Sequence, residues 1–152
     1  MTNKTCCGFG HRQVFANLTE KLDTAVESAI SDGIRTFLTG GMGDFDQAFI
    51  GAVYRAKNRH PKEGIKLILV KPYFSNELNT NREYYETAYD DVLIPEEVMG
   101  VHYKSAITVR NKWMADESDL VIAYVNKNGG AQTAVKYAIK QGKTVINLAD
   151  AE

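Results

Sequence analysis

Short apolar runs alternate with amphipathic stretches along this chain, a pattern typical of repeated strand–helix units. The run at 65–70 is the clearest strand, because a continuous apolar segment suits a strand buried on both faces. The pattern predicts strands at 5–9, 34–39, 65–70, 92–94, 120–125 and 145–148.

Apolar residues spaced three and four positions apart predict the helices between these strands. The first helix begins near Leu18, where Asn17 and Glu20 have the spacing of a capping box, and Gly33 ends it. The other helices are predicted at 46–57, 82–89, 105–117 and 133–141. The segment 71–100 is the hardest to interpret. We expect a doubly wound α/β fold: a mostly parallel, Rossmann-like sheet in a three-layer α/β/α arrangement.

Length and composition fit a single domain spanning 1–152. The chain has 152 residues, of which 44% are hydrophobic and 24% charged, and single cores usually hold about 100–200 residues. Apolar runs are far shorter than the roughly 20 residues that cross a bilayer, so we expect no membrane partner. Adjacent Cys6 and Cys7 are the only cysteines. Neighbours in a strand point to opposite faces, so both are expected in the core, and we expect a cytoplasmic protein.

The charge balance makes nucleic acid an unlikely partner. Basic and acidic residues number 18 and 19, for a formal net charge of -1, which provides no general field for polyanions. A small anion held by one or two arginines remains compatible with this balance. The histidines and cysteines lack the spacing of metal ligands, and no G-x-S-x-G motif suggests a hydrolase triad.

Three glycine-rich turns should meet at one edge of the sheet, because each follows a parallel strand. Glycine lets the backbone approach a ligand closely, and the helix that follows offers unpaired N–H groups suited to phosphate. For any single turn, glycine can equally serve only the tight turn itself. Convergence of all three favours a pocket. The turns contain Gly8 and Gly10; Gly40, Gly41 and Gly43; and Gly129 and Gly130.

Charged residues beside these turns are candidates for ligand binding. Arg12 could clamp a phosphate. Asp44 and Asp46 flank a helix start, where capping is the commonest role of aspartate and hydrogen bonding to ribose hydroxyls is the alternative. The role of Arg110 is left open by the sequence, because an arginine exposed on a helix needs no function. Other candidates at this edge are His11, Met42, Asn111 and Thr133, the last as a cap or phosphate contact.

Four motifs occur together and in order: CGFGHR at 7–12, TGGMGDFDQ at 39–47, RNKWM at 110–114 followed by Ser118 and Asp119, and GGAQT at 129–133 followed by Tyr137 and Ala138. Together they resemble the SLOG superfamily of Rossmann-like domains, which includes DprA and the LOG phosphoribohydrolases. The resemblance is closest to small YpsA-type bacterial and phage proteins, and it covers nearly the whole chain.

The resemblance implies a site for nucleotides or nucleotide derivatives, including NAD- or ADP-ribose-like molecules, with no required cofactor. It favours Arg12, Asp46, Arg110 and Thr133 as site residues. The LOG pattern departs at several positions: Asn111 replaces a lysine, Asn128 a proline and Gln132 a glycine, while Val135 and Lys136 occupy the positions of the catalytic glutamate. Hydrolysis is therefore less favoured, although Asp44, Asp46 or Glu117 could supply a carboxylate.

These observations favour a module that senses or sequesters a nucleotide-derived ligand. The alternative is a phosphoribohydrolase or N-glycosidase acting on a nucleoside monophosphate, and a DprA-like nucleic-acid-binding or scaffold protein is less favoured. Relatives in the superfamily commonly pair through helices, so a homo-oligomer is expected. Core packing is the competing role for the aromatic residues that could form such an interface, namely Tyr84, Tyr85, Tyr89 and Trp113.

Overall fold

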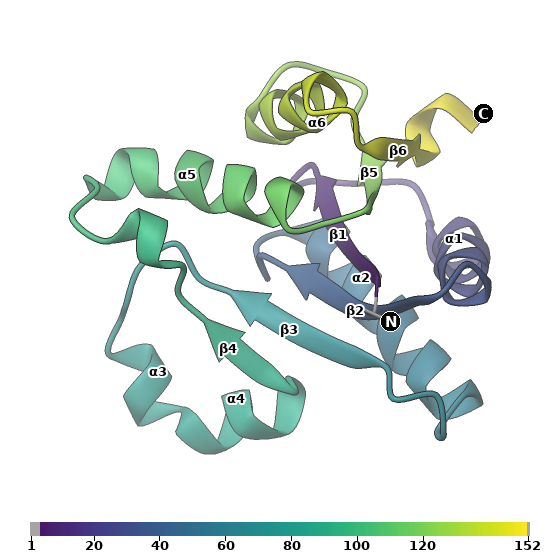
Figure 1. Cartoon of the computed structure of the whole chain (residues 1–152), viewed down its shortest axis with the longest axis horizontal. Helices are drawn as coiled ribbons and strands as arrows, with labels where there is room; N and C mark the ends of the chain where they lie inside the picture. The colour runs from purple at the N-terminus through teal and green to yellow at the C-terminus, as the bar shows by residue number, and fades with distance from the viewer. Residues whose placement is uncertain (1–3, 152) are drawn as a thin grey trace.

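The computed structural model describes residues 4–151 and contains one six-stranded parallel sheet. Its strands are β1 (Lys4–Gly10), β2 (Ile34–Thr39), β3 (Lys66–Val70), β4 (Asp91–Leu93), β5 (Leu120–Tyr124) and β6 (Thr144–Asn147). Their order across the sheet is β4-β3-β2-β1-β5-β6 (Figure 1). The predicted α/β class, parallel sheet and flanking helices are confirmed.

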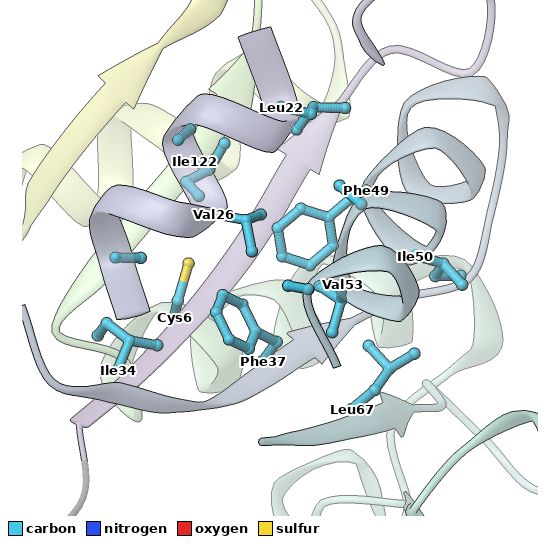
Figure 2. Packing of buried hydrophobic residues seen from close by; sticks show 14 of the residues in the cluster. Cys6, Leu22, Val26, Ile34, Phe37, Phe49, Ile50, Val53, Leu67 and Ile122 are labelled. Carbon is cyan, nitrogen blue, oxygen red and sulfur yellow. The ribbon is translucent and has the colours of Figure 1, made fainter. Parts of the chain in front are cut away.

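Helices cover both faces of the sheet. They are α1 (Thr19–Ser31), α2 (Asp44–Arg59), α3 (Glu77–Thr80), α4 (Arg82–Ala88), α5 (Tyr103–Asp116) and α6 (Gly130–Lys140), with 3₁₀ turns at η1 (Glu96–Val98) and η2 (Leu148–Ala151). Residues of α1 and α2 pack on one face, in a cluster that Figure 2 shows around Phe37, Phe49 and Val26. Residues of α5 and α6 pack on the other face.

The order of the strands reverses at β1. From β1 to β4, each new strand pairs beside the previous one, and the chain then returns through α5 to place β5 on the free side of β1. Cys7 is therefore paired with Leu38 of β2 on one side and with Val121 of β5 on the other. In open α/β sheets, ligands bind beyond the carboxyl ends of the strands at such a switch point.

Three helices start earlier than their apolar periodicity predicts: α5 at Tyr103 rather than 105, and two that begin at the glycine-rich turns. Helix α2 starts at Asp44 and α6 at Gly130, each directly after a glycine with positive φ, Gly43 at 97° and Gly129 at 153°. The apolar spacing does not mark these two starts, because the glycine with positive φ before each helix sets where it begins.

The predicted capping box of the first helix is wrong. Leu18 is the cap residue of α1 and no side chain caps it. The side chain of Asn17 instead accepts a hydrogen bond from the N–H of Thr19, at 3.0 Å. Asn17 lies one position too early to reach the third residue of the helix, which a capping box requires.

The adjacent cysteines lie in the two halves of the core. Both are fully buried, Cys6 in the cluster beneath α1 and α2 and Cys7 in the cluster beneath α5 and α6. This confirms the expectation from strand alternation. Burial raises the pKa of Cys7 to about 12, so this thiol stays protonated. Within the described part of the chain, no helix is long and apolar enough to cross a membrane.

Candidate functional site

A cavity of about 520 Å³ opens at the carboxyl edge of the sheet, where β1, β2 and β5 end. All three glycine-rich turns contribute to its wall, as the sequence predicts. Eleven of the predicted site residues line it: Gly8, Gly10, His11, Arg12, Gly40, Met42, Asp46, Arg110, Asn111, Gly129 and Gly130. Their role in ligand binding stays a prediction.

The other four predicted residues lie outside the cavity wall and support it. Gly41 and Gly43 have positive φ angles of 67° and 97° and shape the turn after β2. The carboxylate of Asp44 accepts a hydrogen bond from the N–H of Val14 at 3.0 Å, which anchors the loop after β1. The hydroxyl of Thr133 donates to the Gly129 carbonyl at 3.2 Å inside α6.

Sequence reasoning missed six residues of the wall: Phe9, Gln13, Ile107, Met114, Lys127 and Ala131. Two of them carried a usable signal. Ile107 and Met114 lie three residues before and four residues after Arg110 on α5, so they share its face of the helix. Lys127 had no such signal, because its place depends on the path of the loop after β5.

Asp46 is a buried carboxylate in the wall of the cavity. Only 8% of the residue is exposed, and one carboxylate oxygen accepts a hydrogen bond from the N–H of Met42 at 2.9 Å. The other oxygen has no hydrogen-bond partner among residues 4–151. Burial raises the pKa of Asp46 to about 6, against the opposing effects of the Met42 N–H, Arg110 and Arg12. Perturbed carboxyls in clefts are candidates for function.

Arg110 is a buried cation that joins α5 to the ends of β2 and β3. Its guanidinium donates to the carbonyl of Val70 at 2.8 Å and to that of Gly40 at 3.5 Å. It also donates to the side chain of Asn111 at 2.8 Å and contacts the sulfur of Met42 at 3.6 Å. Burial lowers the pKa of Arg110, yet a guanidinium keeps its charge in proteins.

These contacts commit most of the donors of Arg110 to the protein itself. Gly40 makes the close approach possible, since a Cβ at this position would lie 2.9 Å from Nη1 of Arg110. Arg110 therefore provides positive charge beside Asp46 and holds the floor of the cavity together. It has less capacity for a bidentate phosphate contact than a free arginine.

The two helices that start at the site differ in their unpaired N–H groups. At α2, the N–H of Asp44 donates to the carbonyl of Arg12 at 2.8 Å and that of Phe45 to the carbonyl of His11 at 3.3 Å. At α6, the first three N–H groups, of residues 130–132, have no hydrogen-bond acceptor within the described ranges. An anion is therefore better accommodated at α6 than at α2.

Positive side chains stand at the mouth of the cavity. Arg12 and Lys127 are both exposed and both line it, from the loops that follow β1 and β5. Together with the first turn of α6, they give this end of the site a positive potential. No group of histidine, cysteine or carboxylate side chains in residues 4–151 could hold a metal ion.

No family model matches this sequence, and no curated protein matches it either. Solved structures do. DNA processing protein A (DprA) from Streptococcus pneumoniae matches with a TM-score of 0.65 and 16% identity over 94% of this chain. The molybdenum cofactor carrier protein from Chlamydomonas reinhardtii matches with a TM-score of 0.64 and 17% identity over 97% of this chain. The molybdenum cofactor binding protein from Rippkaea orientalis matches with a TM-score of 0.63 and 21% identity, also over 97%.

These similarities establish a shared Rossmann-like fold. They show the fold alone, so the resemblance to the SLOG superfamily and the closeness to YpsA-type proteins both stay predictions. The chain spans 49% of the length of the pneumococcal DprA structure and 64% of a DprA structure from Helicobacter pylori, which has 20% identity and a TM-score of 0.62 over 95% of this chain. It spans 78% of the Chlamydomonas carrier protein and 77% of the Rippkaea protein.

Proposed function

We propose that this chain binds a phosphate-bearing nucleotide derivative in the cavity and senses or sequesters it. The observation that carries this proposal is the pairing of two unlike groups in one cavity. Unpaired N–H groups at the start of α6 suit an anion, while the buried Asp46 carboxylate suits a hydrogen-bond donor such as a sugar hydroxyl. A phosphorylated sugar carries both features.

The size of the cavity supports a ligand of this class. Its volume of about 520 Å³ lies within the range of roughly 300–1,000 Å³ typical of small-molecule sites. Arg12 and Lys127 at the mouth add charge that would attract a phosphate or pyrophosphate. The resemblance to YpsA-type proteins suggests an NAD- or ADP-ribose-like molecule within this class.

The structural neighbours support ligand binding in a broad sense. Two of them are named as carrying or binding the molybdenum cofactor, and the DprA structure from Helicobacter pylori is described as binding single-stranded DNA. Because DNA binding occurs on a similar fold, single-stranded DNA belongs in any ligand screen of this chain.

A second candidate is cleavage of an N-glycosidic bond, and Asp46 is the observation that favours it. Among residues 4–151, Asp46 is the only carboxylate in the cavity wall, and its raised pKa suits proton transfer near neutral pH. Val135 and Lys136, at the positions of the LOG glutamate, carry no carboxylate and lie outside the cavity wall. Glu117 directly follows α5 and lies away from the cavity. Two residues further on, the Asp119 carboxylate accepts a hydrogen bond from the N–H of Thr5, at the opposite edge of the sheet.

The experiment is a thermal-shift screen of the purified protein, followed by chromatography of each mixture. The compounds are AMP, ATP, NAD, ADP-ribose, cyclic ADP-ribose isomers and cyclic dinucleotides, with single-stranded DNA at several salt concentrations. Stabilisation by a nucleotide that is recovered intact supports the proposal, and release of free base identifies an enzyme instead. A steeply salt-dependent shift with DNA alone would identify a nucleic-acid-binding protein. If none of the compounds raises the melting temperature, the proposed binding site is contradicted.

Variants locate the ligand once a compound binds. Arg12→Ala and Lys127→Ala should each weaken binding of the phosphate-bearing compounds by about 3- to 10-fold, the loss of one partly exposed charged contact. Arg82→Ala is the matched control, because Arg82 is also exposed but lies on α4, outside the cavity wall. Equal effects of all three variants would exclude a phosphate at the α6 end.

A further inference from the structure

A side-chain hydrogen bond joins the loops that follow β1 and β5 at the switch point of the sheet. His11 directly follows β1, and its Nε2 lies 3.0 Å from the backbone nitrogen of Asn126, which follows β5 by two residues. These two strands are neighbours in the sheet although most of the chain separates them. The bond therefore connects two loops that both line the cavity.

The chemistry of this bond defines the state of the histidine. A backbone N–H can only donate, so Nε2 must accept, and a neutral imidazole then carries its hydrogen on Nδ1. The surroundings favour this neutral state, because burial, followed by the charge of Lys127, lowers the pKa of His11. The ring of Tyr124 packs against it edge-on, with the ring centroids 6.3 Å apart.

Beyond Val125, which exchanges two hydrogen bonds with the side chain of Asn147, the loop after β5 has few anchors. Residues 126–130 are all exposed. Among the described residues, the backbone and side chains of 126–128 form only one hydrogen bond, the one to His11. The next anchored residue is Gly129, whose carbonyl accepts the first hydrogen bonds within α6. Within the described residues, the contact with His11 is therefore the one hydrogen bond that fixes the backbone between Val125 and the start of α6.

We propose that His11 is a positioning residue: as a neutral imidazole with its hydrogen on Nδ1, it holds the Asn126–Gly130 loop so that the N–H groups at the start of α6 face the cavity. His11 thus acts through the loop on the anion of the ligand. The part of this inference that concerns binding of an anion rests on the proposed function. The role of His11 in holding the loop stands on the geometry of the loop alone.

Two variants separate the hydrogen bond from the shape of the ring. His11→Phe keeps an aromatic ring and removes the acceptor. His11→Gln places an amide oxygen near the position of Nε2 and can still accept from the Asn126 N–H. We expect hydrogen exchange of the Asn126 amide to be at least about 10-fold faster in His11→Phe and near the wild-type rate in His11→Gln, as the loss of one hydrogen bond implies.

Binding of inorganic pyrophosphate, measured by calorimetry, should follow the same order. His11→Phe should weaken it about 10-fold, while His11→Gln should stay within about 3-fold of the wild type. Rescue by glutamine is the result that a purely structural role of the imidazole ring would not produce. Equal loss in both variants, or equal exchange rates of Asn126 in wild type and His11→Phe, overturns the proposal.

The nitrogen-15 spectrum of the imidazole in the unsubstituted protein decides the question if His11→Phe does not fold. A hydrogen on Nδ1 and a protected Asn126 amide in His11→Gln support the proposal, and a hydrogen on Nε2 overturns it. Failure of the wild-type protein to bind pyrophosphate would remove the anion site alone. Exchange at Asn126 and the imidazole spectrum would still determine whether His11 holds the loop.

Discussion

Asp46 shows how a site residue can act against stability. Its pKa is raised from 3.8 to about 6, chiefly by burial. Between these two values the folded protein binds more protons than the unfolded chain, so the free energy of unfolding falls as the pH rises through this interval. A shift of this size corresponds to roughly 3 kcal/mol at neutral pH. Keeping a charged carboxylate in the cavity therefore has a measurable cost.

Asp46→Asn should separate function from stability. Asparagine keeps an acceptor for the N–H of Met42 and removes the buried charge, so the melting temperature should rise at pH 7.5 and lose its decline between pH 4 and 6. Affinity for ADP-ribose, or for another compound found in the screen, should fall about 10-fold with the loss of a charged acceptor. Thermal unfolding across pH and calorimetry measure the two effects. A lower melting temperature with unchanged affinity would make Asp46 a purely structural residue.

Glycines of the cavity wall differ in how much space surrounds them. A Cβ at Gly10 would overlap the ring of Phe45, which is fully buried and stacks on Phe49. A Cβ at Gly130 would have no neighbour within 4 Å. We expect Gly10→Ala to lower the free energy of unfolding by about 1–3 kcal/mol or more, through overpacking. Gly130→Ala should leave it unchanged or raise it slightly, as alanine favours helix. Urea denaturation measures both, and equal effects would refute the close packing at Gly10.

At the scale of elements, the unpaired N–H groups at the start of α6 can be removed one at a time by substitution. Ala131 is the second residue of α6, and proline there would remove one of the unpaired N–H groups without breaking a helical hydrogen bond. Ala131→Pro should weaken pyrophosphate binding about 10-fold, because one anion contact is lost. Calorimetry gives the affinity and circular dichroism checks the fold.

Glu20→Pro is the matched control, since Glu20 is the second residue of α1 and lies outside the cavity wall. Both substitutions place proline after a helical residue and should carry a similar local cost. Equal binding by the two variants would show that the N–H of Ala131 does not contact the anion.

Sequence reasoning reached the strands and the glycine turns because both depend on local patterns. It did not reach the role of Arg110, whose acceptors Val70 and Gly40 lie 40 and 70 residues away in the chain. It placed Thr133 at a helix start because apolar spacing begins there, whereas a positive φ at Gly129 starts α6 three residues earlier. In the segment 71–100, the sequence predicts α4 and β4, whereas α3 and η1 are too short to have a periodicity of their own. Their conformation depends on contacts with the rest of the fold.

At the scale of the whole molecule, the expected homo-oligomer is still a prediction, and the structure narrows where an interface could form. Tyr85 and Tyr89 are buried in the core, 8% exposed each, whereas Tyr84 is 61% exposed on α4. If helices pair through this surface, Tyr84→Glu should lower the mass measured by light scattering to that of a monomer. Tyr103→Glu, at an equally exposed position on α5, is the control. A monomeric wild type, or an unchanged mass in Tyr84→Glu, would exclude this interface.

The place of β1 in the sheet also has a consequence for how the protein is made. On the ribosome, β1 can pair with β2 early, but its other edge stays unpaired until β5, which begins at Leu120, emerges. Pairing of distant segments slows folding, and an unpaired apolar strand exposes the nascent chain to aggregation. The cavity opens over the junction of β1 and β5, which can form only after β5 has emerged. A bound ligand would therefore favour completed chains over truncated ones, and the proportion of full-length soluble protein in cells should rise with the supply of that ligand.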